Sequence, residues 1–218
     1  MRDSYHDALD GVTDQLVMMT RTVGSMIERA SSALLEADLA KAESVIAADE
    51  EVDTAEVELE LRCTDLLALQ QPVATDLRLV TGALRMSATI ERMGDLARHI
   101  AKIARMRYPD SAVPEQLRPI FIDMSKQVSV MGQRIGDVVA DKDLSLAYEI
   151  ERLDDGVDDL HRQLLQALLS DWQGTVDQAV DVTLMARFYE RFADHTVSIA
   201  RRIVYTTTGT RYNELEKG

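Results

Sequence analysis

The chain has a single cysteine among its 218 residues and no long apolar run. One cysteine excludes both an intramolecular disulfide and a zinc-ribbon spacing. Cys63 falls on an apolar helical stripe, which favours a buried structural thiol over a nucleophile. No stretch of about 18 apolar residues is present, and the N-terminus has no apolar signal core. The sequence therefore predicts a cytoplasmic protein that meets membranes only indirectly, through partners.

Proline, glycine and aromatic residues are scarce. There are only 4 prolines and 10 glycines, no proline follows Pro119, and aromatic residues make up 5% of the chain. Ala, Leu, Met, Glu and Arg, which favour helices, are abundant instead. The sequence also lacks a Gly-rich phosphate loop, a Gly-x-Ser-x-Gly turn and a His-Glu-x-x-His motif. These absences predict an all-α protein that is not an enzyme.

Basic residues are outnumbered, with 24 against 38 acidic residues and a formal net charge of −14. This balance argues against nucleic-acid binding, which needs a cationic surface to displace counterions from phosphates. It suits the binding of metal cations or of a basic partner surface. A role in solubility alone is an open alternative.

Apolar residues recur at spacings of three and four through six segments, the pattern of packed amphipathic helices. Asp38 is a predicted N-cap of the second helix, and Pro72 ends it, because the residue before proline disfavours helix. The predicted helices span residues 5–36, 39–69, 73–106, 119–140, 144–170 and 175–205. The polar tail after Thr206 is expected to fray.

The two halves of the chain repeat each other. The segment Glu91-Arg92-Met93-Gly94-Asp95 returns as Glu190-Arg191-Phe192-Ala193-Asp194, an offset of 99 residues. The preceding helices match at an offset of 105, which predicts a loop six residues shorter in the second copy. With a linker over residues 107–115, the sequence predicts two tandem three-helix bundles related by internal repeat, residues 1–108 and 109–218.

Four pairs of carboxylates stand four residues apart in predicted helices. Such a spacing places two side chains about 6 Å apart along the helix axis, where they can share one cation. Helical wheels place the pairs of the third and sixth helices about 140–180° from the core stripe, and the other two at its flank. This outward position excludes a di-iron site inside the bundle, and a merely solvated acidic face remains an alternative. The candidate metal ligands are Asp49, Asp53, Glu91, Asp95, Asp154, Asp158, Glu190 and Asp194.

His99 and His195 follow the two motifs at unequal offsets from the glutamates. Neither stands three residues after a glutamate, as a di-iron carboxylate motif requires. Lone histidines on helices are usually solvated, and the sequence predicts the same for these two.

At these residues the chain resembles the PhoU family of phosphate-transport accessory proteins. Residues 73–78 with the Glu91–Asp95 motif resemble the first family signature, and residues 186–195 resemble the second. The resemblance implies a non-enzymatic regulator that couples the ATP-binding subunit of a phosphate ABC importer to a sensor histidine kinase. It implies a homodimer that holds the phosphate-starvation response off. It also implies metal clusters, with iron, zinc or magnesium as candidate ions, on the eight carboxylates.

The sequence departs from the family pattern at two positions. Ala193 replaces the usual glycine of the second motif, and Leu96 replaces the usual histidine of the first. Neither residue is a carboxylate ligand, so the departures make the two sites chemically unequal without removing them. A metal-dependent hydrolase or oxidase and a purely structural helical dimer are the alternative functions.

Overall fold

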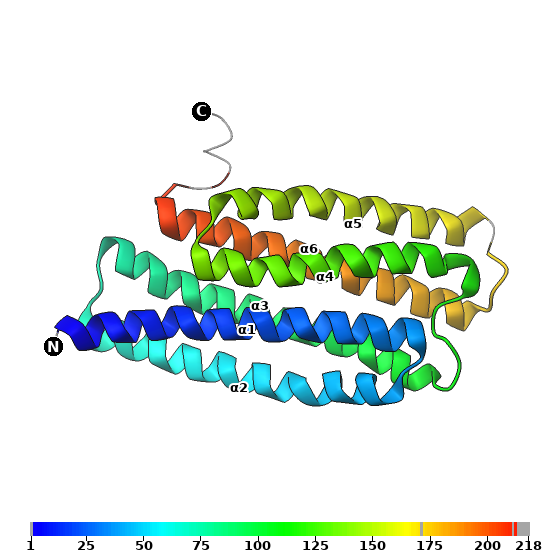
Figure 1. The fold of residues 1–218 in the computed structure, drawn as a ribbon, viewed down its shortest axis with the longest axis horizontal. Coiled ribbons are helices and arrows are strands. Elements are labelled where there is room, and N and C mark those ends of the chain that lie inside the picture. Colours follow the sequence, from blue (N-terminus) through cyan, green and yellow to red (C-terminus); the bar gives the residue numbers. More distant parts are fainter. Residues whose placement is uncertain (1, 171, 211, 213–218) are drawn as a thin grey trace.

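The computed structural model describes residues 2–170, 172–210 and 212, and within these ranges it contains helices and no strand. This confirms the predicted all-α fold, shown in Figure 1. None of the described helices is both long and apolar enough to cross a membrane. The helices are α1 (Arg2–Glu36), α2 (Leu39–Gln70), α3 (Ala74–Arg107), α4 (Arg118–Asp141), α5 (Leu144–Ser170) and α6 (Val176–Thr208), with a short 3₁₀ turn, η1 (Glu115–Leu117), before α4.

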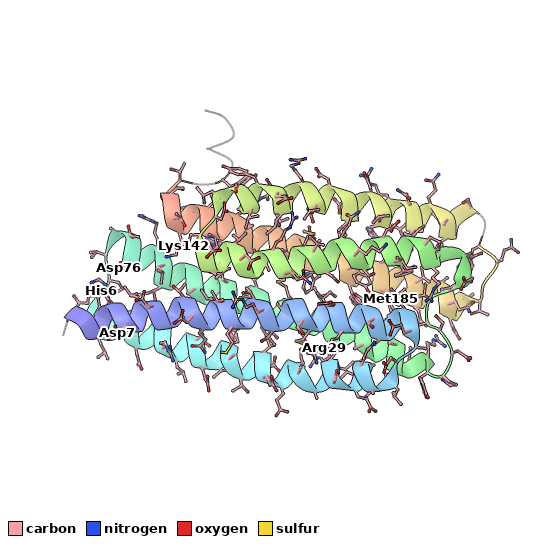
Figure 2. The ribbon with its side chains drawn as sticks, in the orientation of Figure 1. His6, Asp7, Arg29, Asp76, Lys142 and Met185 are labelled. Atoms are coloured by element: carbon pink, nitrogen blue, oxygen red, sulfur yellow. The ribbon has the colours of Figure 1, made fainter. Side chains whose placement is uncertain are left out.

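Local chemistry fixes where several helices begin. The Asp38 carboxylate accepts a hydrogen bond from the backbone N–H of Lys41 at 3.0 Å, which confirms it as the N-cap of α2. At the start of α6, Thr175 and Gln178 form a reciprocal capping box. Polar side chains project from the outer faces of the helices along the whole molecule (Figure 2).

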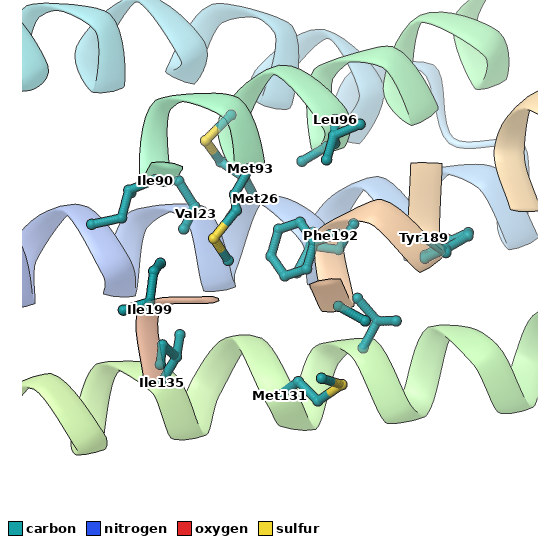
Figure 3. Close-up of a cluster of buried hydrophobic side chains, with 14 of the residues drawn as sticks. Val23, Met26, Ile90, Met93, Leu96, Met131, Ile135, Tyr189, Phe192 and Ile199 are labelled. Atoms are coloured by element: carbon teal, nitrogen blue, oxygen red, sulfur yellow. The ribbon is translucent and has the colours of Figure 1, made fainter. Parts of the chain in front are cut away.

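The six helices form two antiparallel three-helix groups that pack side by side, with α1 against α4 and α3 against α6 (Figure 1). Their apolar side chains make one continuous cluster. Figure 3 shows side chains from both halves meeting in it, among them Val23, Met26, Ile90, Met93, Met131, Ile135, Phe192 and Ile199. The repeated halves thus share one core. Their division into domains after residue 108 stays a prediction.

The segment between α3 and η1 is held against the core, although the sequence predicts a linker there. Ala112 and Val113 are buried, and the Ser111 hydroxyl accepts a hydrogen bond from the Val113 N–H at 3.2 Å. Prolines and polar residues mark the break in helical periodicity, but they do not reveal the two apolar anchors inside it.

The predicted difference in loop length is wrong. Residues 71–73 join α2 to α3, whereas residues 171–175 join α5 to α6, so the second loop is the longer one. The change of the repeat offset from 105 to 99 arises in the helices instead. Helix α2 has 32 residues against 27 in α5, and α6 starts closer to its motif than α3 does. The α2–α3 hairpin is therefore longer than its counterpart in the second half.

Cys63 is fully buried in α2, as its place on the apolar stripe predicts. Burial raises the pKa of its thiol to about 11. The thiol therefore stays protonated at neutral pH and serves as a small apolar side chain.

The backbones of the two halves approach each other closely at a pair of glycines. A Cβ atom added to Gly24 of α1 would lie 2.5 Å from the carbonyl oxygen of Gly132 in α4. A Cβ atom on Gly132 would in turn lie 3.1 Å from the Gly24 Cα. Each glycine costs its helix about 1 kcal/mol relative to alanine, and the closer packing of α1 on α4 offsets that cost.

We expect Gly24→Ala to lower the free energy of unfolding by about 3 kcal/mol, because the new methyl group meets backbone that cannot rotate away. Gly11→Ala is the matched control on the same helix. Its methyl group would meet only the end of the Arg62 side chain, so this variant should be neutral or more stable by up to about 1 kcal/mol. Urea denaturation measures both, and equal effects would refute the backbone contact.

Candidate functional site

The structure gathers the eight predicted carboxylates into two clusters of four. The first acidic cluster joins Asp49 and Asp53 of α2 to Glu91 and Asp95 of α3, and its members repel one another electrostatically. The second acidic cluster joins residues of α5 and α6 in the same way, and consists of Asp154, Asp158, Glu190 and Asp194. In each half, the two carboxylate pairs that the sequence singles out are therefore brought together.

The prediction that the carboxylates lie outside the core is wrong for Asp49, which the helical wheel placed at the flank of the α2 stripe. Asp49 is only 2% exposed, and Glu91 and Asp95 are half-buried. Asp49 reaches α3 because Gly94 has no side chain: a Cβ atom there would lie 3.3 Å from the Asp49 Oδ1. The wheel assumes one apolar stripe on α3. The helix instead buries a second strip against α2, and Gly94 belongs to it.

Arg98 is the counter-ion of the first acidic cluster, a role that was not predicted from the sequence. Its Nη1 lies 2.5 Å from the Asp49 Oδ2, and its Nη2 pairs with Asp95. The guanidinium therefore bridges α2 and α3. Its place three residues after Asp95, on the same face of α3, is the one signal that could have revealed it.

The second acidic cluster lacks this arginine, because Val197 occupies the position equivalent to Arg98. Arg187 pairs with Glu190 instead, at the edge of the cluster. Burial and the surrounding carboxylates, first of all Asp158 and then Asp194, raise the pKa of Asp154 to about 7. The second cluster is therefore the less neutralised of the two.

Each cluster contains a buried carboxylate oxygen that accepts no hydrogen bond. These oxygens are Asp49 Oδ1 and Glu190 Oε2. Burying such an oxygen costs folding free energy unless a cation or a hydrogen-bond donor reaches it, so both clusters suit cation binding. Within the described ranges, however, no three acidic, histidine or cysteine side chains are close enough together to hold one ion. Any ion would have to draw these carboxylates inward.

The two histidines lie in the contact between α3 and α6, and the prediction that they are solvated is wrong. The ring of His99 stacks on Phe188 with 5.2 Å between ring centroids. His195 is half-buried, and burial lowers its pKa. Both rings therefore contribute to packing between the halves.

Comparison with known proteins shows what the chain is similar to. Residues 16–104 and 121–203 match the model of the PhoU domain. The chain is 45% identical over 210 residues to phosphate-specific transport system accessory protein PhoU homolog 2 of Mycobacterium tuberculosis, covering 96% of this chain and 99% of that protein. Homolog 1 of the same species is 41% identical over 217 residues, covering 99% and 98%.

Solved structures agree. The crystal structure of PhoU from Pseudomonas aeruginosa superposes with a TM-score of 0.84 at 26% identity, over 94% of this chain and all of that one. The phosphate transport system regulatory protein PhoU from Streptococcus pneumoniae gives 0.83 at 26% identity, over 95% and 98%. The likeness therefore extends over both repeated halves.

In metal-free buffer at pH 8.5, we expect Asp154→Asn to raise the free energy of unfolding by about 2 kcal/mol, because it removes a charge that its surroundings disfavour. The folded-state pKa of Asp154 lies above its unfolded value, so the wild type loses stability as the pH rises through about 7. The gap between variant and wild type should thus shrink at pH 5. Urea denaturation at both pH values, with exposed Glu58→Gln as control, tests this, and a gap that does not change with pH contradicts it.

Proposed function

This chain belongs to the PhoU family, and on that premise we propose that it is an accessory protein of a phosphate transport system. The observation that carries the proposal is the family match across both halves, with relatives of that name covered almost end to end. The protein would act by binding, which agrees with a sequence that lacks the common catalytic motifs.

Its partners would be the ATP-binding subunit of a phosphate ABC importer and a sensor histidine kinase. By contacting both in the cytoplasm, as a homodimer, it would hold the phosphate-starvation response off while phosphate is plentiful. The net charge of −14 supports docking on basic partner surfaces, because complementary charge speeds and orients encounter.

We expect the purified chain to capture the cognate importer ATPase and the kinase from cells grown with ample phosphate. The measurement is affinity purification followed by mass spectrometry. Deleting the gene should switch on phosphate-starvation genes in the same medium. Absence of both partners, together with unchanged gene expression, would refute this role and favour a purely structural dimer.

We also propose that the acidic clusters bind divalent cations, with iron, zinc and magnesium as candidates. The buried oxygens without donors support this, since carboxylate oxygens are ligands that all three ions accept. A cation at the first cluster would compete with Arg98 for Asp49 and Asp95. At the second cluster the arginine, Arg187, pairs with a single carboxylate, Glu190, so this cluster should bind the more tightly.

Elemental analysis after purification without chelators tests the metal proposal. We expect Glu190→Gln/Asp194→Asn to lower the affinity for metal by at least about tenfold. Arg98→Gln should instead tighten binding at the first cluster, because it removes the competing cation. The control is Glu58→Gln/Glu60→Gln, which removes the same number of negative charges from α2.

Two outcomes would overturn this assignment. Metal-free wild-type protein that takes up no ion on titration would leave the clusters as a solvated acidic face. Metal-dependent turnover that requires Glu91 or Glu190 would support a hydrolase or oxidase instead of a regulator.

A further inference from the structure

A cleft of about 780 Å³ opens between α3 and α6, beside the second acidic cluster. Two faces of antiparallel helices form it: residues 78–85 of α3 and residues 194–205 of α6, with Asp154 of α5 at one end and Tyr212 at the rim. Four arginines line this cleft in a chain whose net charge is −14, namely Arg78, Arg85, Arg201 and Arg202.

One of the four arginines is already engaged. The Arg201 Nε donates to the Glu151 Oε1 at 2.6 Å, and its guanidinium lies over the ring of Tyr212, 5.4 Å from the centroid. Among the described residues, the other three have no carboxylate within ion-pair distance. Three positive charges therefore line this cleft without an ion pair to any residue that the structure describes.

Packing holds Arg78 and Arg202 in place. The buried Nε of Arg78 has no hydrogen-bond acceptor, and its Nη2 donates to the Thr75 hydroxyl at 3.1 Å. The stem of Arg202 lies over Gly82, where an added Cβ would be 3.8 Å from the Arg202 Cδ. Burial, followed by the charge of Arg85, lowers the pKa of Arg202. Positive charges held near one another repel, and an anion bound between them relieves this repulsion and lowers the free energy.

The repeat shows that the missing counter-ion is particular to this end of the molecule. In the other half, the position equivalent to Gly82 is Asp181, whose Oδ2 accepts a hydrogen bond from the Arg107 Nε at 2.5 Å. The positions equivalent to Arg78 and Arg85 are Asp177 and Leu184. At that end of the α3–α6 contact a carboxylate of α6 therefore pairs with an arginine of α3, whereas Arg78, Arg85 and Arg202 of the cleft form no ion pair with the two carboxylates that line it, Asp154 and Asp194.

We propose that this cleft binds a phosphate-bearing anion, either free inorganic phosphate or the phosphate group of a small organic molecule, through Arg78, Arg85 and Arg202. Guanidinium groups present paired N–H donors that match phosphate oxygens, and Thr81, Ser198 and Tyr205 line the same cleft with hydroxyl groups. The volume lies within the usual range of small-ligand sites. The carboxylates of Asp154 and Asp194 repel an anion from the opposite end, so it sits at the arginines.

Isothermal titration calorimetry in EDTA and about 50 mM salt tests the cleft, with inorganic phosphate and AMP as separate probes. We expect saturable binding of at least one probe, and Arg85→Gln/Arg202→Gln should weaken it at least about tenfold. Arg85 is exposed, so Arg85→Gln alone tests the site without disturbing packing. The control is Arg62→Gln/Arg105→Gln, which removes the same charge from exposed positions outside the cleft.

Each outcome decides the proposal. Binding of inorganic phosphate shows that the free ion suffices, and binding of AMP alone assigns the site to an organic phosphate. No binding of either probe, or equal losses in the cleft and control variants, overturns it. Binding that appears only with added Mg²⁺ and survives Arg85→Gln/Arg202→Gln also overturns it, because the anion would then sit on the acidic cluster. The inference rests on the cleft itself and stands or falls separately from the accessory role.

Discussion

The touching backbones of Gly24 and Gly132 determine how the rest of the molecule is arranged. Side chains at these positions would push α1 and α4 apart, and the shared core would lose its continuity. With α1 and α4 in contact, α3 and α6 close the other side of the core, as Figure 1 shows. The α3–α6 contact then brings the two signature motifs, the two histidines and the arginine-lined cleft onto one side of the molecule.

Much of the fold could be predicted from the sequence, because the signals are local. Apolar periodicity located all six helices to within three residues at each end, and Asp38 was identified as a cap from its type and place alone. The repeat identified the two halves. Their shared core could not be predicted, because an apolar stripe shows that a helix is buried without showing which helix covers it.

The grouping of the carboxylates could be predicted from the sequence, but their environment could not. Spacing along α2 and α3 placed four carboxylates together, which needs only the repeat and short connections. The burial of Asp49 depends on a glycine in a neighbouring helix, and its charge is balanced by Arg98, 49 positions along the chain. The arginine-lined cleft needs the start of α3 beside the end of α6, a juxtaposition that only the three-dimensional structure provides.

The longer α2–α3 hairpin has a consequence for recognition. Two repeated halves offer a partner two nearly equivalent ways to dock, which differ by a half-turn. Here the α2–α3 hairpin is the longer of the two, and the end near Arg78 carries a cleft with three arginines that form no ion pair with a described residue. The two ends of the molecule are thus chemically different, so a partner that binds this side should bind in one orientation only.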